Sequence, residues 1–139
     1  MNYLLFLFIS LFNLSSNAEK FDLKITVTNV KTQKGSVEIG IFNDEKSFLV
    51  KGKEYKTGSK VVTNDTIVFI LKDLTKDDYA ISLYQDINSD KKCNLNFFGI
   101  PVEPYGFSNN FKPKLSKPSF NDCKIEVNNN SSIMIKLLN

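Results

Sequence analysis

Histidine is absent from the 139-residue sequence, which removes the side chain most often used as a general base and as a zinc ligand. The sequence also lacks the Gly-x-Ser-x-Gly motif that carries the nucleophile of many hydrolases, and its two cysteines have no histidine partner for a papain-like pair. These absences exclude the common serine–histidine and cysteine–histidine catalytic sets. Paired carboxylates remain as the catalytic alternative, and motifs identify no catalytic residue.

Long runs of one charge are lacking as well. The formal net charge is +3, and the densest lysine clusters are Lys51 with Lys53 and Lys112 with Lys114 and Lys117. Basic arms that bind nucleic acids carry longer runs of like charge. We therefore expect these lysines to solvate the surface, and we expect no nucleic-acid partner.

A single long apolar segment is present, from Tyr3 to Leu14, and it is followed by Ser16-Asn17-Ala18. Small residues at the two positions that a signal peptidase reads are typical of a secretory signal peptide, and the apolar segment is too short for a transmembrane helix. The sequence therefore predicts a signal peptide over residues 1–18, one mature domain over 19–139, no membrane span, and a secreted or periplasmic location.

Apolar and polar residues alternate through much of the remaining chain, which is typical of half-buried β-strands. The predicted strands cover residues 21–28, 37–41, 60–63, 66–71, 79–84, 120–127 and 132–137. The run 66–71 is continuously apolar, so we expect it to be buried on both faces. The turn at 31–35 predicts a hairpin between the first two strands, and one helical turn is expected at 43–49. About seven short strands without a long helix predict an all-β, antiparallel β-sandwich.

The segment 86–118 is too long for an ordinary connection, and loops of this length are functional or disordered. Its first residues have the spacing of a calcium loop, which supplies oxygen ligands from alternate positions. The predicted ligands are Asp86, Asn88, Asp90, the carbonyl of Lys92, and Asn94. Lys91 replaces the usual glycine, and Phe97 stands where a bidentate carboxylate is expected. The alternative is an Asx-rich turn whose side chains bond their own backbone.

Aromatic residues are dense in the same segment: Phe97, Phe98, Tyr105, Phe107 and Phe111. They are suited to a platform for a sugar or for a hydrophobic partner protein, and alternatively to a satellite core packed on one end of the sandwich. Asp86 and Glu103 are the carboxylates available for a hydrolase, but their separation decides that chemistry and the sequence does not give it.

The pattern of this segment resembles a family of small secreted bacterial proteins that is a domain of unknown function. The shared positions are Asp86, Asn88, Asn96, Gly99, Pro101, Glu103, Tyr105, Gly106, Phe107, Ser108, Asn109, Asn110, Pro118, Phe120 and Asp122. This sequence departs from the family pattern at Lys91 and Pro104, where the family has glycine, and at Asn94, where it has aspartate. The resemblance implies an immunoglobulin-like or transthyretin-like sandwich outside the cytoplasm, and it implies no reaction.

Cys93 and Cys123 are the only cysteines, and both stand where the resembled family carries small or apolar residues. Because the predicted signal peptide leads to an oxidising compartment, we expect them to form a disulfide. The alternative is two free thiols.

Together these patterns favour a non-enzymatic binding or structural module that uses residues 86–111. The residues expected to form its ligand surface are Glu103, Tyr105, Phe107, Asn109 and Asn110. A hydrolase using Asp86 or Glu103, and a module that pairs an edge strand with another chain, are the alternatives. Calcium is the one cofactor that the residues suggest.

Overall fold

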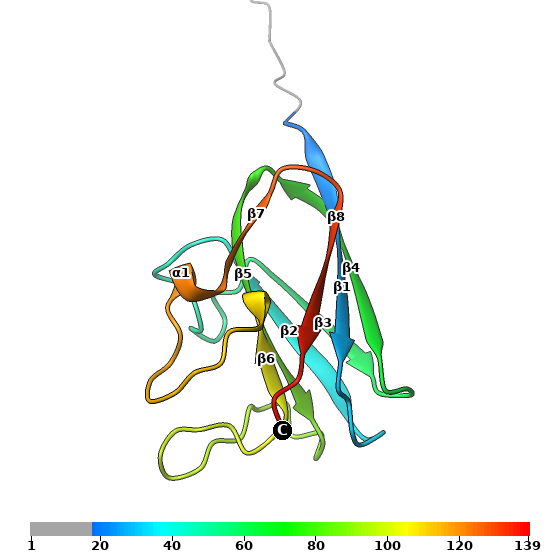
Figure 1. Ribbon diagram of the computed structural model, residues 1–139, viewed down its shortest axis with the longest axis vertical. Helices are drawn as coiled ribbons and strands as arrows, with labels where there is room; N and C mark the ends of the chain where they lie inside the picture. The colour runs from blue at the N-terminus through cyan, green and yellow to red at the C-terminus, as the bar shows by residue number, and fades with distance from the viewer. Residues whose placement is uncertain (1–17) are drawn as a thin grey trace, which may run out of the picture.

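The computed structural model describes residues 18–139 (Figure 1), so all of the predicted signal peptide except Ala18 lies outside the described residues. The strands are β1 Lys20–Thr28, β2 Ser36–Phe42, β3 Lys56–Val61, β4 Ile67–Thr75, β5 Asp77–Asp86, β6 Tyr105–Phe107, β7 Lys124–Val127 and β8 Ser131–Lys136. Two single turns of helix complete the secondary structure, the 3-10 turn η1 Ser108–Asn110 and the α-helical turn α1 Phe120–Cys123. In this part of the chain, no helix has the length and apolarity that crossing a bilayer requires.

The strands form two sheets. One has the order β4-β1-β8, and the other has the order β3-β2-β5-β6, with β7 also paired to β5. The named strands pair in antiparallel fashion, except that β1 and β8 are parallel. The predicted all-β sandwich is therefore confirmed.

The main core lies between the sheets, because alternate residues of each strand point inward. Leu23, Ile25 and Val27 enter it from β1, and Ile81 and Leu83 enter it from β5. Burial of each such side chain contributes about 1.5–3 kcal/mol. The alternation that predicted the strands is thus the pattern that builds this core.

Several local predictions are wrong. The first two strands do not form a hairpin, since β1 pairs with β4 and β8 while β2 pairs with β3 and β5 in the other sheet. The strand predicted at 66–71 is buried on one face only, and its Ile70 is 49% exposed. Residues 120–123 form α1 before the strand begins, because Ser119 and Asp122 make a capping box. β3 starts at Lys56, four residues before the strand predicted at 60–63.

A second apolar cluster lies on the outer face of the β2–β5–β6 sheet. It contains Phe42, Ala80, Phe107, Phe120 and Cys123, and Phe48 from the turn after β2 packs against it. The ring of Phe48 meets those of Phe42 and Phe120 edge-on, at centroid distances of 5.4 and 5.9 Å. This cluster covers part of the outer face, and the neighbouring part, around Gly40 and Ser82, borders open cavities.

Candidate functional site

The long loop (residues 86–118) begins at a buried carboxylate. Asp86 ends β5 and is 1% exposed, and its two oxygens accept hydrogen bonds from the backbone N–H groups of Asp90 (3.2 Å) and Lys91 (2.8 Å). Lys91 has a φ of 60°, in the left-handed region that favours glycine. The side chain of Asp86 therefore closes a tight turn in which Lys91 occupies a glycine-like position.

Glu103 stabilises the backbone on either side of this turn. It is 8% exposed, and its carboxylate accepts hydrogen bonds from the backbone N–H groups of Ile87 (3.0 Å) and Asn94 (3.4 Å). Asp86 and Glu103 thus use their oxygens to hold backbone donors. Both residues come from the predicted site, but neither lines either of the two cavities described below.

The predicted calcium ligands form a network of Asx turns. The backbone N–H of Asp90 donates to Asn88, and the carboxylate of Asp90 accepts from the N–H of Lys92 (2.9 Å) and from the side-chain amide of Asn94 (3.0 Å). The hydrogen bonds that the carboxylate accepts, that from Asn94 first, lower the pKa of the Asp90 carboxyl. Among the described residues, no group of three or more Asp, Glu, Cys or His side chains is placed to hold a metal ion. The geometry favours the Asx-rich turn, and the calcium site stays a prediction.

Ser108 joins two short strands that share one edge of β5. β6 pairs with residues 82–84 of β5 and β7 pairs with residues 77–80, which leaves Ile81 between them. The buried hydroxyl of Ser108 accepts the N–H of Ile81 (2.9 Å) and donates to the carbonyl of Cys123. The Ser108 hydroxyl therefore bonds the β5 backbone at Ile81, where neither β6 nor β7 pairs with it.

Asn109 and Asn110 are structural as well. The amide of Asn109 donates to the carbonyl of Lys124 (2.8 Å), where β7 begins. Asn110 bonds the backbone of β8 twice, donating to Met134 (3.0 Å) and accepting from Lys136 (2.7 Å). These bonds satisfy β8 backbone groups as another strand would. The two residues were expected on a ligand surface, but they attach the long loop to both sheets.

The predicted disulfide is absent, and both cysteines are free. Cys123 is fully buried in the second apolar cluster at the end of α1, whereas Cys93 is exposed on the long loop. Burial raises the pKa of the Cys123 thiol to about 12. The number of cysteines and the predicted compartment do not suffice for a disulfide, which also needs the two Cβ atoms to face each other.

Residues 94–102, here called the tip hairpin, project from the sandwich beside β6 (Figure 1, yellow-green). The hairpin is closed by backbone bonds from Asn96 to Ile100 (2.8 Å) and from Val102 to Asn94 (2.9 Å), and Gly99 adopts a φ of 74° in its turn. Phe97 and Phe98 stack edge-on with their centroids 5.5 Å apart, and Phe97 is 97% exposed. The aromatic residues predicted to form one platform thus lie in two places. Phe107 is buried in the second cluster, while the tip hairpin is solvent-exposed.

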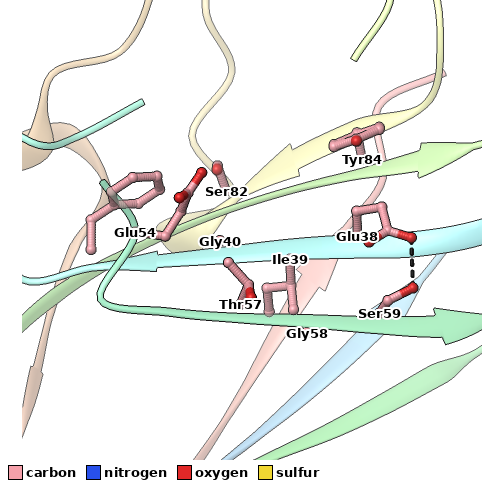
Figure 2. Close-up of a pocket in the computed structure, with 10 residues that line it drawn as sticks. Glu38, Ile39, Gly40, Glu54, Thr57, Gly58, Ser59, Ser82 and Tyr84 are labelled. Carbon is pink, nitrogen blue, oxygen red and sulfur yellow. Dashed lines mark hydrogen bonds between the residues drawn. The ribbon is translucent and has the colours of Figure 1, made fainter. Parts of the chain in front are cut away.

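A groove with a volume of about 830 Å³ lies between the outer sheet face and the long loop. Its floor includes Ser82, Tyr84 and Tyr105, and its walls come from the tip hairpin and from residues 113–118. A smaller cavity of about 300 Å³ over β2 and β3 shares Phe42, Glu54, Ser82 and Tyr84 with the groove. Figure 2 shows Ser82 and Tyr84 in this smaller cavity, with Glu38 bonded to Ser59 (2.6 Å).

The groove contains fewer of the predicted site residues than expected. Tyr105 and Phe107 line it, as do Lys92 and Cys93, but Glu103, Asn109 and Asn110 do not. The wall residues that sequence reasoning missed include Leu95, Ile100 and Leu115, and lysines interpreted as surface solvation. The one sequence signal that could have indicated these wall residues was the clustering of Lys114 and Lys117 near the aromatic-rich segment.

Tyr84 is one of three polar residues that line both cavities, with Ser82 and Glu54. Burial, and next the carboxylate of Glu38, raise the pKa of the Tyr84 phenol to about 12. Its hydroxyl therefore stays protonated at physiological pH and is able to donate a hydrogen bond to a bound molecule.

Comparison with known proteins identifies the family. Residues 25–135 match the sequence model of a family described as "Uncharacterized protein conserved in bacteria (DUF2141)". The chain belongs to this family. For this DUF2141 protein, comparison with curated proteins and with solved structures gave no match. The match spans β2 to β7 completely, so it covers the signature segment together with most of the sandwich.

Proposed function

We propose that this protein is a non-catalytic binding module that works outside the cytoplasm and takes its ligand in the groove beneath the long loop. The observation that carries this proposal is the groove itself, whose volume of about 830 Å³ is in the range of small-molecule sites. The predicted signal peptide over residues 1–18 supports the extracytoplasmic location.

The exposed apolar side chains of the groove support a binding role. Leu95, Phe98, Ile100 and Leu115 all line the groove and are all exposed large hydrophobic residues. A concentration of exposed apolar surface in one place is typical of an interaction site. A ligand in the groove would remove part of this surface from water.

The geometry favours binding over the hydrolase alternative. A general acid or base must reach its substrate within hydrogen-bond distance. Asp86 and Glu103 bond backbone N–H groups at the base of the loop, and neither lines the groove. These two carboxylates therefore have a structural role in this account.

Pairing of an edge strand with another chain is also disfavoured. The lysines of β3 bond backbone carbonyls of β4, Lys56 to Lys72 (2.6 Å) and Lys60 to Val68 (2.5 Å). Lysines at sheet edges oppose the addition of a further strand. The groove is a better candidate for the working surface.

A neutral apolar fluorophore, N-phenyl-1-naphthylamine, tests the proposal through its increase in fluorescence on binding. Ser82→Phe places a ring on the groove floor from the outer face of β5, and we expect it to weaken binding at least tenfold. Ser132→Phe is the matched control, since Ser132 is exposed on the other sheet. Absence of binding by the unmodified protein, or equal binding by both variants, would contradict the proposal.

The proposed location has its own test. Intact-mass analysis of exported protein is expected to give a chain that begins at Glu19. A chain in that fraction that retains Met1 would contradict cleavage after Ala18.

A further inference from the structure

The charged residues of the groove are mostly of one sign. Five lysines line it, Lys51, Lys91, Lys92, Lys114 and Lys117, and Glu54 is the one carboxylate among its lining residues. The whole chain has a formal net charge of only +3. The groove is therefore more positive than the average surface of this protein, and it attracts anions.

Four of the five lysines come from the long loop, whereas Lys51 and Glu54 both come from the segment before β3. Lys91 and Lys92 come from the start of the long loop, and Lys114 and Lys117 come from its last part. Glu38, on β2, lines the smaller cavity over β2 and β3 together with Glu54. The loop contributes four lysines to the lining, while its carboxylates Asp86, Asp90 and Glu103 do not line the groove, and this arrangement orients a charged ligand with its anionic group at the loop.

Apart from the lysines, the walls of the groove are predominantly apolar. Leu95, Phe98, Ile100, Pro101, Leu115 and Pro118 line it. A fully hydrophilic anion would leave these side chains exposed, whereas an apolar body would cover them. The exposed lysines keep their ammonium groups at the rim, where a solvated negative head group would lie.

From this juxtaposition we infer that the ligand is an amphipathic anion, a small molecule with an acyl-chain or aromatic body and one negatively charged head group. The inference rests on the proposed function and adds the chemical class of the ligand. The apolar body lies over Ser82 and Tyr84, and the head group lies among the lysines of the loop wall. Attraction between exposed charges is screened by salt, so the preference for the anion decreases as ionic strength rises.

Two fluorophores with nearly the same apolar body test the inference in the purified exported protein. One is the anion 8-anilinonaphthalene-1-sulfonate, and the other is the neutral N-phenyl-1-naphthylamine. We expect the anion to bind at least fivefold more tightly at low salt. We expect this preference to disappear when Lys91, Lys92, Lys114 and Lys117 are all changed to Gln, with binding of the neutral probe unchanged.

The matched control changes four exposed lysines elsewhere, Lys20, Lys24, Lys72 and Lys76, to Gln, so that the net charge falls by the same amount. This control is expected to keep the preference for the anion. Loss of the preference in the control as well would overturn the inference, because the effect would then come from overall charge. The thermal unfolding midpoint of each variant checks that it is folded.

Other outcomes separate this inference from the proposed function. Equal affinity for the two probes would overturn the anion preference and leave the binding module in place. Binding of neither probe would contradict both. Sedimentation with phosphatidylglycerol vesicles, combined with no binding of the soluble anion, would overturn the inference in favour of a membrane surface.

Discussion

Two sets of side chains in and around the long loop perform different tasks. The first set, here called the polar signature, contains the Asp, Asn, Glu and Ser residues that carry the family resemblance: Asp86, Asn88, Asn96, Glu103, Ser108, Asn109, Asn110 and Asp122. Each of them bonds a backbone N–H or carbonyl group. The second set is the five groove lysines, none of which belongs to the signature. The comparison teaches that the signature reports how the loop is folded, while the residues that we propose to select the ligand lie outside it.

Among the substitutions that test this comparison, Ser108→Ala is expected to change the free energy of unfolding most. The change leaves the N–H of Ile81 and the carbonyl of Cys123 without their buried partner. We expect a loss of about 2–4 kcal/mol in the free energy of unfolding. Urea denaturation measures it, with the exposed Ser116→Ala as control. A loss equal to that of the control would mean that Ser108 does not join β6 to β7.

Glu103→Ala is expected to have the next largest effect. Its carboxylate holds two backbone donors at the base of the tip hairpin, and hydrogen bonds to charged groups contribute about 1.5–3 kcal/mol. We expect a loss of that size, together with faster hydrogen exchange at the amides of Ile87 and Asn94. Glu45→Ala, at an exposed position in the turn after β2, is the control. Unchanged exchange at both amides would refute the structural role of Glu103.

Lys91→Gly is expected to stabilise the protein. Left-handed backbone costs about 1–2 kcal/mol for a residue other than glycine, and the flexibility of glycine offsets about half of the gain. The expected net gain is about 0.5–1 kcal/mol. Lys92→Gly is the neighbouring control, because Lys92 lacks a positive φ, and it should be destabilising. A loss of stability in Lys91→Gly would contradict the turn geometry.

Alkylation of the two cysteines tests the structure without any substitution, so no change in stability is expected. Without reductant, the native protein should be alkylated once, at exposed Cys93, and the denatured protein twice. Cys123 is protected by burial and by a thiol pKa raised to about 12. Since Cys93 lines the groove, the anionic probe should slow its alkylation. Failure of the denatured, unreduced protein to react would indicate the disulfide that the structure lacks.

Local patterns predicted the sandwich well because alternation of apolar and polar residues reports directly which face of a strand is buried. The burial of Leu23, Ile25 and Val27 was predictable without knowing which strands pair with β1. Pairing was less predictable, since the partners of β1 are β4 and β8, which are distant in sequence. The predicted hairpin is wrong because two strands that follow each other in sequence can belong to different sheets of a sandwich.

The candidate site stays a prediction, and its details differ from those expected. The length and aromatic content of 86–118 pointed to a segment that does line the groove, and the Asx-rich turn was the stated alternative to calcium. Sequence alone did not reveal that Asp86 and Glu103 face backbone donors, because that depends on how the loop folds back on itself. Lys51 joins the groove from a different part of the chain, so only the fold brings it near Lys114.

The most direct test of the groove is a map of backbone amide chemical shifts during titration with 8-anilinonaphthalene-1-sulfonate. We predict the largest shifts at Ser82 and Tyr84, in the tip hairpin at 95–100, and at 114–117, with small shifts at Ser108, Asn109 and Asn110. Shifts concentrated on the exposed face of β1 and β4, or none that saturate, would contradict the claim that the long loop and the outer sheet face form a ligand-binding groove.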